Sequence, residues 1–268
     1  MKPLPMYRLL RLFSLAMVVV WSAAACDDSS DGNVEDDGHG LPEYEGWELV
    51  WYDQFEDSTV NRFLWNVLNR EHSYNNELQY YVPEDVYIEN RCLRIRSQKR
   101  PYGSKEYTSG QVHTQNKHSW TYGRFVVRAR LPRGQGMWPA HWMLPQDSSW
   151  PPEIDIMEFL GHDPHTIYMT NHWGEHRNGW HPSRGGSHTS SIDYTENFHT
   201  FAVEWEPGII KWFIDDTLRF ISSEGVPGKP FFIILNTAVG GDWPGNPNET
   251  TVFPQYHDID YVAVYQRP

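Results

Sequence analysis

Three carboxyl side chains lie within six residues of the chain, at Glu153, Asp155 and Glu158. In a regular strand Glu153 and Asp155 share one face, but Glu158 is five residues from Glu153 and would point to the opposite, apolar face. An ionised glutamate in an apolar core is very costly. One extra residue, a β-bulge at Ile156 and Met157, would switch the parity of the strand and return Glu158 to the face of the other two acids. The spacing therefore predicts a bulged strand with three acids on one face.

Such a face could perform acid–base chemistry on a sugar. With the bulge, the Cα atoms of Glu153 and Glu158 lie ~13 Å apart at ~3.3 Å per residue. Side chains that lean inward then leave a gap of about 5 to 7 Å between the carboxyls, which favours a retaining over an inverting glycosidase. Mutual repulsion, with no Lys or Arg between the acids, keeps one carboxyl protonated, as a general acid requires. The alternative is an ordinary solvated strand face.

Tryptophans surround the acidic segment, at Trp138, Trp142, Trp150, Trp173 and Trp180. Indole rings pack against the apolar faces of sugars and carboxylates bind their hydroxyls, so an acidic cleft rich in Trp favours a carbohydrate over a nucleotide. The glycines before Trp138 and the proline after it indicate a loop, and we expect this ring in the cleft. Three other tryptophans within alternating segments are predicted to pack in the core, namely Trp51, Trp205 and Trp212.

The elements that position these residues are strands. From Trp47 onward, apolar and polar residues alternate in segments 47–55, 86–98, 120–131, 153–160, 165–173, 199–206, 209–221, 231–239 and 258–266. Turn residues separate these segments, including Asp215 and Asp216, whereas residues 174–191 have the composition of a loop. No segment has helical periodicity over three turns. The pattern predicts an all-β fold, an antiparallel β-sandwich, in one domain over residues 46–268.

The N-terminal residues predict export. Residues 1–26 have a basic start, an apolar run from Leu9 to Trp21 and small residues before Cys26, the order of a bacterial secretion or lipoprotein signal. The apolar run is shorter than the ~20 residues that span a bilayer. We expect acylation of Cys26 and attachment to a membrane or cell surface, or a secreted protein if cleavage simply follows Ala25. Residues 27–45 are acidic and are predicted to be a flexible linker.

Composition excludes several other functions. The net charge of −13 argues against nucleic acid or an anionic lipid surface as a partner. The two cysteines match no zinc spacing, and Cys92, which alternates with apolar residues, is predicted to be a buried, unreactive thiol. Histidines 162–188 could bind zinc, but His172 and His176 are separated by Trp-Gly-Glu, lack the H-E-x-x-H pattern and fall in a predicted strand and loop. A catalytic metal is therefore not expected.

Five motifs in order resemble one family. The strings YNNELQYY, WTYGRFVVRARLPRGQGMWPAHWMLP, EIDIMEFLG, LNTAVGGDWPG and DYVAVYQ resemble glycoside hydrolase family 16, particularly its bacterial laminarinase-like members. The resemblance implies a concave β-jelly roll with an open substrate groove, and a retaining mechanism without a catalytic cofactor. It implies that Glu153 is the nucleophile, Glu158 the acid/base and Asp155 the carboxyl between them.

The same resemblance implies further site residues. Six positions are expected to line the cleft: Asn76, Trp138, Trp142, His172, Asn236 and Trp243. Asp260 matches a residue of a structural calcium site on the convex face of many relatives. The Trp-Pro-Pro approach to Glu153 and the histidine-rich loop after His172 depart from the family pattern. Both departures lie near the cleft, so they affect the sugar specificity more than the chemistry.

The sequence thus predicts an exported, monomeric endo-glycoside hydrolase. The expected polysaccharide is a β-1,3-glucan of the laminarin type or a mixed-linkage β-1,3-1,4-glucan. Two alternatives stay open: a hydrolase of a marine galactan (agarose, porphyran or carrageenan), and a non-catalytic glycan-binding surface protein on the same fold. A pure binder has no need of an acid at Glu158 with its parity-switching bulge, which favours the enzyme.

Overall fold

The computed structural model describes residues 40–177 and 180–268, and these residues form two large stacked β-sheets. The eight-stranded sheet has the order β15 (Thr217–Ser222), β14 (Ile209–Ile214), β13 (His199–Glu206), β8 (Gly123–Arg130), β17 (Gln255–Gln266), β5 (Cys92–Ser97) and β4 (Val86–Glu89), and β1 (Glu48–Asp53) also pairs with β17. The seven-stranded sheet has the order β12 (Ser183–Thr189), β11 (Thr166–His172), β10 (Glu153–Phe159), β9 (Met137–Pro145), β16 (Phe231–Val239), β7 (Gln111–His113) and β2 (Asn66–Val67).

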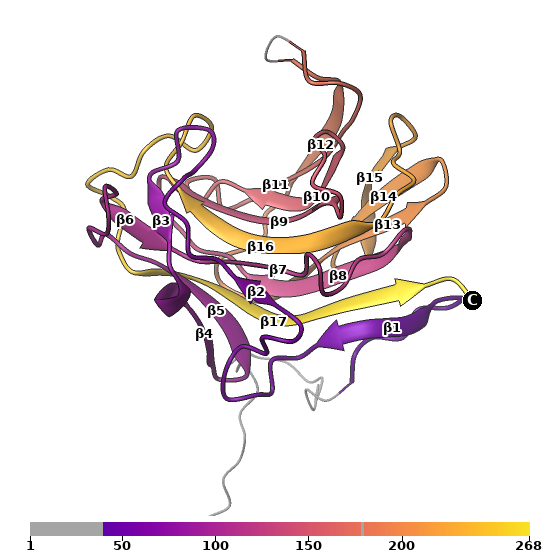
Figure 1. The fold of residues 1–268 in the computed structure, drawn as a ribbon, viewed down its shortest axis with the longest axis horizontal. Coiled ribbons are helices and arrows are strands. Elements are labelled where there is room, and N and C mark those ends of the chain that lie inside the picture. Colours follow the sequence, from indigo (N-terminus) through magenta and orange to yellow (C-terminus); the bar gives the residue numbers. More distant parts are fainter. Residues whose placement is uncertain (1–39, 178–179) are drawn as a thin grey trace, which may run out of the picture.

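The strand pairs of both large sheets are antiparallel. A small parallel pair, β3 (Gln79–Tyr81) and β6 (Tyr107–Ser109), and a short 3-10 helix, η1 (Pro83–Asp85), complete the described elements. Both large sheets are curved, and β9 and β16 arch over β8 and β17 (Figure 1). The predicted all-β antiparallel sandwich is confirmed. No helix in the described ranges is long and apolar enough to cross a membrane.

Tight turns produce two of the hairpins. Asp215 and Asp216, at φ 48° and 54°, join β14 to β15, as the sequence predicted. Asn90 and Arg91, at φ 51° and 59°, join β4 to β5 in the same way. Two consecutive residues with positive φ form the turn whose twist matches that of the flanking strands. Segments 86–98 and 209–221 are therefore hairpins, not single strands.

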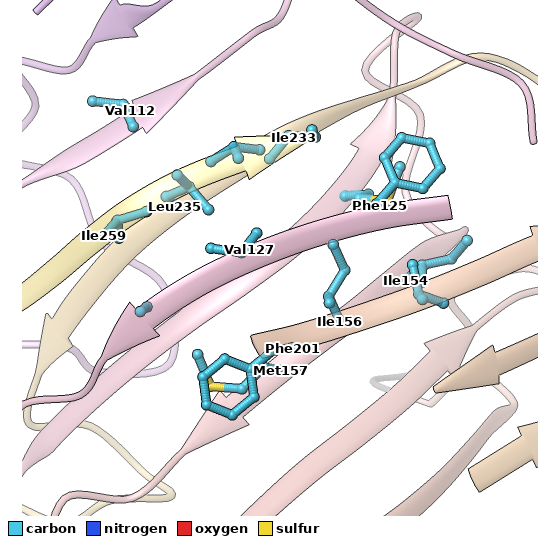
Figure 2. Close-up of a cluster of buried hydrophobic side chains, with 14 of the residues drawn as sticks. Val112, Phe125, Val127, Ile154, Ile156, Met157, Phe201, Ile233, Leu235 and Ile259 are labelled. Carbon is cyan, nitrogen blue, oxygen red and sulfur yellow. The ribbon is translucent and has the colours of Figure 1, made fainter. Parts of the chain in front are cut away.

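The core lies between the two sheets. Alternate residues of β8, β13, β14 and β17 meet alternate residues of β10 and β16 in one buried cluster, several members of which are shown in Figure 2. Trp205 and Trp212 are fully buried and Trp51 packs against the cluster, as predicted. Because successive residues of a strand point to opposite sides, Trp142, Glu153 and His172 lie on the other face of the seven-stranded sheet, the open face, where their side chains are only partly buried.

The structure corrects four expectations from the sequence. Residues 183–189 form strand β12 instead of a loop, because they pair along the length of β11. Trp138 lies in β9 and not in a loop. The packed domain begins before residue 46, since Leu41 and Tyr44 pack against the eight-stranded sheet and Pro42 accepts a hydrogen bond from Tyr265 Oη.

The fourth correction concerns Cys92. This side chain is buried, but it is disulfide-bonded instead of being a thiol. The chain has one other cysteine, Cys26. Cys26, the signal segment 1–26 and linker residues 27–39 lie outside the described residues.

Candidate active site

The register of β10 contains the predicted bulge. Against β9, Asp155 pairs with Trp142 and Met157 pairs with His141, so Ile156 is the extra residue. Against β11, the register likewise shifts between Asp155 and Glu158. Ile154, Ile156 and Met157 are buried in the core, whereas Glu153 and Glu158 are only partly buried. The extra residue thus brings all three acids to the open face of the seven-stranded sheet.

Two indoles hold the outer acids. Trp150 donates its Nε1–H to Glu153 Oε2 at 2.8 Å, and Trp138 donates its Nε1–H to Glu158 Oε1 at 3.2 Å. Trp138, predicted to lie in the cleft, therefore contacts Glu158 directly. The resemblance had not assigned Trp150 a role, although its position three residues before Glu153 was a signal.

Asp155 is the most deeply placed of the three acids, at 2% exposure. Its Oδ2 lies 3.1 Å from His172 Nε2, and the same nitrogen lies 3.8 Å from Glu153 Oε1. The pairing of Glu153 with His172 across β10 and β11 brings these groups together. In Glu153, Asp155 and His172, one carboxylate oxygen or ring nitrogen of each residue lies within 4.8 Å of those of the other two. These atoms are engaged with one another and with Trp150, which suits a cluster that shares protons.

Burial raises the pKa values of all three acids, and the charges of neighbouring acids raise those of Glu153 and Glu158 further. Burial, and next the charge of Asp155, raise the pKa of Glu153 to about 8, although His172 and the Trp150 hydrogen bond act in the opposite direction. Burial raises the pKa of Asp155 to about 7. Burial, Asp155 and Glu153 raise the pKa of Glu158 well above its usual range. The cluster therefore holds protons at neutral pH, which is the condition for a general acid.

A core residue supports the bulge. Trp212, from β14 of the opposite sheet, donates its Nε1–H to the backbone carbonyl of Asp155 at 2.8 Å. A bulge interrupts the ladder and leaves backbone groups without strand partners. Trp212 therefore packs the core and also fixes the backbone of β10 directly before the extra residue Ile156. Sequence reasoning missed this second role because nothing in the strand pattern of β14 signals the contact.

The remaining predicted cleft residues form two further groups. Trp142 donates its Nε1–H to Asn236 Oδ1 at 2.7 Å, and Asn236 donates to Tyr81 Oη at 3.0 Å. Tyr81, fully buried, was not predicted. This network joins β9, β16 and β3 and orients the Trp142 ring beside the acids.

The second group lies around Trp243, which is 41% exposed. Its ring meets that of Trp138 edge-on at 5.6 Å and that of Tyr168 at 4.8 Å. Asn76 donates a hydrogen bond from Nδ2 to Oδ1 of Asp242 at 2.9 Å, and Asp242 directly precedes Trp243 in the chain. The structure thus brings together the predicted Asn76, Trp138 and Trp243 at one side of the three acids.

Within residues 40–177 and 180–268, Asp260 belongs to no group of three or more metal-ligating side chains. Its Oδ2 accepts a hydrogen bond from Arg128 Nη1 at 2.7 Å. The group of three such side chains found in the described residues is that of Glu153, Asp155 and His172, away from Asp260. Because Arg128 neutralises the carboxylate, the side chains around Asp260 do not fit the calcium site that the resemblance implied.

Comparison with known proteins decides the family. The model of glycosyl hydrolases family 16 matches residues 65–262. The chain belongs to this family. It is 39% identical over 245 residues to the beta-glucanase of Rhodothermus marinus, covering 82% of this chain and 85% of the relative.

Solved structures agree with this assignment. The laminarinase catalytic domain of Thermotoga maritima is 38% identical, with a TM-score of 0.77, and the match covers 83% of this family 16 chain and 99% of that domain. The endo-beta-1,3-glucanase of Pyrococcus furiosus is 39% identical, with a TM-score of 0.76 and coverage of 82% and 94%. The chain is therefore a glycoside hydrolase with the jelly-roll fold of these enzymes, and family 16 catalysis needs no cofactor.

Proposed function

We propose that this family 16 enzyme cleaves β-1,3-linked glucan, or mixed-linkage β-1,3-1,4-glucan, by a retaining double displacement. The observation that carries the proposal is the bulged strand β10, which presents Glu153, Asp155 and Glu158 on one face. In such a mechanism the two outer acids have different tasks, and the raised pKa values supply both an anion and a proton donor once the cluster has lost part of its protons.

The chemistry has two steps. In the first, ionised Glu153 attacks the anomeric carbon while Glu158 gives its proton to the leaving oxygen, and a glycosyl ester forms at Glu153. In the second, Glu158, now ionised, takes a proton from water as the water attacks the same carbon and the ester breaks. Asp155, between the two and hydrogen-bonded to His172, tunes how the cluster distributes its protons.

Two observations support a neutral glucan as the substrate. Relatives named beta-glucanase, laminarinase and endo-beta-1,3-glucanase match most of the described chain. Within the described residues, the base paired with Glu153 and Asp155 is a histidine, and no Lys or Arg perturbs the three acids. An acidic site without fixed cations repels sulfate groups, which disfavours carrageenan and porphyran. The non-catalytic alternative is disfavoured because both outer acids are present and held by indoles.

The test is a comparison of polysaccharides. The protein is incubated with laminarin, lichenan, agarose and carrageenan, new reducing ends are measured, and early products are followed by NMR. We expect β-anomers and a mixture of oligosaccharide lengths from laminarin, since an endo-acting retaining enzyme cleaves bonds within the polysaccharide chain. Activity on agarose or carrageenan alone would overturn the glucan assignment, and immediate α-products would overturn retention. Binding without any new reducing ends would favour the glycan-binding alternative.

We further propose that the chain is exported. The support is the signal-like segment 1–26 and the acidic linker that follows it. Acylation would use the sulfur of Cys26, and a disulfide with Cys92 would use the same atom, so the two exclude each other. Mass spectrometry of the mature protein from membrane and medium fractions distinguishes an acylated Cys26 from a Cys26–Cys92 disulfide and from cleavage after Ala25. A protein retained in the cytoplasm would overturn export.

A further inference from the structure

A second histidine continues the hydrogen-bonded row that begins at Asp155. His172 reaches Asp155 Oδ2 through Nε2 at 3.1 Å, and its other ring nitrogen, Nδ1, lies 2.8 Å from His181 Nε2. His181 comes from the loop between β11 and β12, which departs from the family pattern, and its Nδ1 is buried with no hydrogen-bond partner among the described residues. The row therefore ends at His181.

The end of the row dictates which nitrogens carry protons. Between two imidazoles, one nitrogen must donate and the other accept. If His172 Nδ1 donated, His181 would accept at Nε2 and carry its own proton on the partnerless Nδ1, and a buried N–H without an acceptor is costly. The favoured arrangement has His181 donating from Nε2, His172 accepting at Nδ1, and His172 carrying its proton on Nε2, directed at Asp155.

We propose that His181 is a positioning residue for the hydrolysis: it fixes His172 as the Nε2–H tautomer, so that Asp155 receives a hydrogen bond and the proton of the cluster is held by Glu158. The inference rests on the proposed roles of Glu153 and Glu158. It assigns a task to the histidine-rich loop, which is otherwise unexplained.

The groups that face this pair fit the assignment. From β10, Glu153 and Asp155 face His172, and in the loop His176 lies 5.8 Å from His181 between ring centroids. Burial lowers the pKa of both His172 and His181, and the neighbouring histidines lower that of His181 further. Neutral imidazoles are what the row requires, since each then has one donor and one acceptor nitrogen.

Trp150 ties His181 to the nucleophile by a second route. Its ring meets that of His181 edge-on at 4.7 Å, and its Nε1–H bonds Glu153. A packing role alone would therefore also affect activity. The experiment must separate the hydrogen bond of His181 from the volume of its ring.

Three variants make this separation. His181→Phe keeps a ring and removes the donor, whereas His181→Gln keeps a side-chain N–H that can reach His172. His176→Phe is the matched control, because His176 is an exposed member of the same loop whose ring also lies near Trp150, at 5.1 Å. For each, kcat and KM on laminarin are measured from pH 4 to 9, with a melting curve.

We expect His181→Phe to lower kcat about tenfold with little change in KM, and to move the acidic limb of the profile about one unit towards higher pH. The reason is that Asp155, without a reliable donor, binds a proton more tightly, and the cluster must reach a higher pH to lose it. His181→Gln should restore most of both effects, and His176→Phe should follow the wild type. Equal loss in His181→Phe and His181→Gln, or an unmoved limb in both, would overturn the proposal.

Nitrogen NMR of wild-type His172 supplies a readout independent of activity and of variant folding. A protonated Nε2 and an unprotonated Nδ1 are expected at neutral pH, and the opposite tautomer would overturn the inference. If the wild type hydrolyses none of the polysaccharides, or does so with inversion, the proposed function fails, while the tautomer measurement still decides whether His181 sets the protonation of His172.

Discussion

At the scale of single residues, the surroundings of Glu158 favour proton donation but reduce the stability of the fold. Trp138 donates a hydrogen bond to it, and burial with two neighbouring acids raises its pKa well above the usual range. A carboxyl held neutral in this way is ready to give a proton to a leaving group. The same surroundings oppose its ionisation, which the unfolded chain permits freely. Activity at this position is therefore obtained at the expense of folding stability.

Glu158→Gln tests both consequences. We expect the variant to lose activity by a factor of about 10² to 10⁴, the usual contribution of general acid catalysis. An acid whose pKa is raised in the folded state contributes stability that is fully present below its unfolded pKa and is lost as the pH rises towards the folded value. Glutamine does not titrate, so calorimetry should find a melting temperature about 2 to 4 °C above the wild type at pH 8, and no gain near pH 4. An equal shift at both pH values would contradict this account.

Trp138 allows sugar stacking to be distinguished from packing. It is partly buried, contacts Glu158 and Trp243, and lies on the open face, whereas Trp205 is fully buried in the core. Trp138→Ala should lower kcat/KM by about 1 to 3 kcal/mol of transition-state stabilisation with little change in melting temperature. Trp205→Ala is the control and should lose about 3 to 5 kcal/mol of folding free energy. A large melting shift with near-normal kcat/KM for Trp138→Ala would show that its ring is structural.

At the scale of elements, the bulge in β10 decides the site. Ile156 is the extra residue against β9. As a result, two consecutive side chains, those of Ile156 and Met157, are both buried in the core. Without Ile156 the strand would alternate regularly and Glu158 would still face outward, one residue nearer to Glu153. Without Ile154, by contrast, Asp155 would be moved to the core face.

Deleting each isoleucine in turn tests this parity. The Ile156 deletion should fold, with a reduced melting temperature from the lost core side chain, and should keep measurable hydrolysis because all three acids stay on the open face. The Ile154 deletion should fail to fold or melt far lower, since an acid enters the core. Melting curves and reducing-end assays compare the two. Similar stability for both deletions would mean that the bulge does not set the parity of the strand.

At the scale of the whole molecule, two buried histidines join the sheets. His141 of β9 and His257 of β17 are fully buried, with Nε2 atoms 2.9 Å apart and rings stacked at 5.0 Å. Burial lowers the pKa of His257 to about 4 and that of His141 well below its usual value, and the nearby His257 adds to the latter shift. The contact between the sheets is thus formed by neutral rings.

This contact predicts a loss of stability in acid. A histidine whose pKa is lowered in the folded state stabilises the fold above its unfolded pKa of about 6.5, and this stability is lost as the pH falls towards the folded value of about 4. The free energy of unfolding, measured with denaturant, should therefore decrease as the pH falls from about 6.5 to about 4. The double variant His141→Gln with His257→Gln should depend less steeply on pH, and exposed His162→Gln should follow the wild type. If the free energy of unfolding depended equally steeply on pH in the wild type and the double variant, the histidine pair would not be the cause of the acid sensitivity, because the carboxyl contributions are the same in both proteins.

Short-range patterns in the sequence were sufficient for the fold class and the acids. Alternation of apolar and polar residues predicted the strands, because burying one face of a sheet requires that period. The five-residue spacing from Glu153 to Glu158 predicted the bulge, because the core excludes an ionised acid. Both inferences need only the order of residues along one strand. The motif resemblance added the family, which the match over residues 65–262 confirms.

Contacts between distant segments were decided by the tertiary structure alone. Residues 183–189 read as a loop because serine and glycine carry no alternation, and pairing with β11 makes them a strand. Trp212 reaches the carbonyl of Asp155 from the opposite sheet, and Arg128 neutralises Asp260 from a neighbouring strand. Such pairs are separated by 57 and 132 residues, so no local rule links them. The physical reason is that hydrogen bonds and charges act over a few ångströms in space, and only the folded chain determines which side chains lie within that distance.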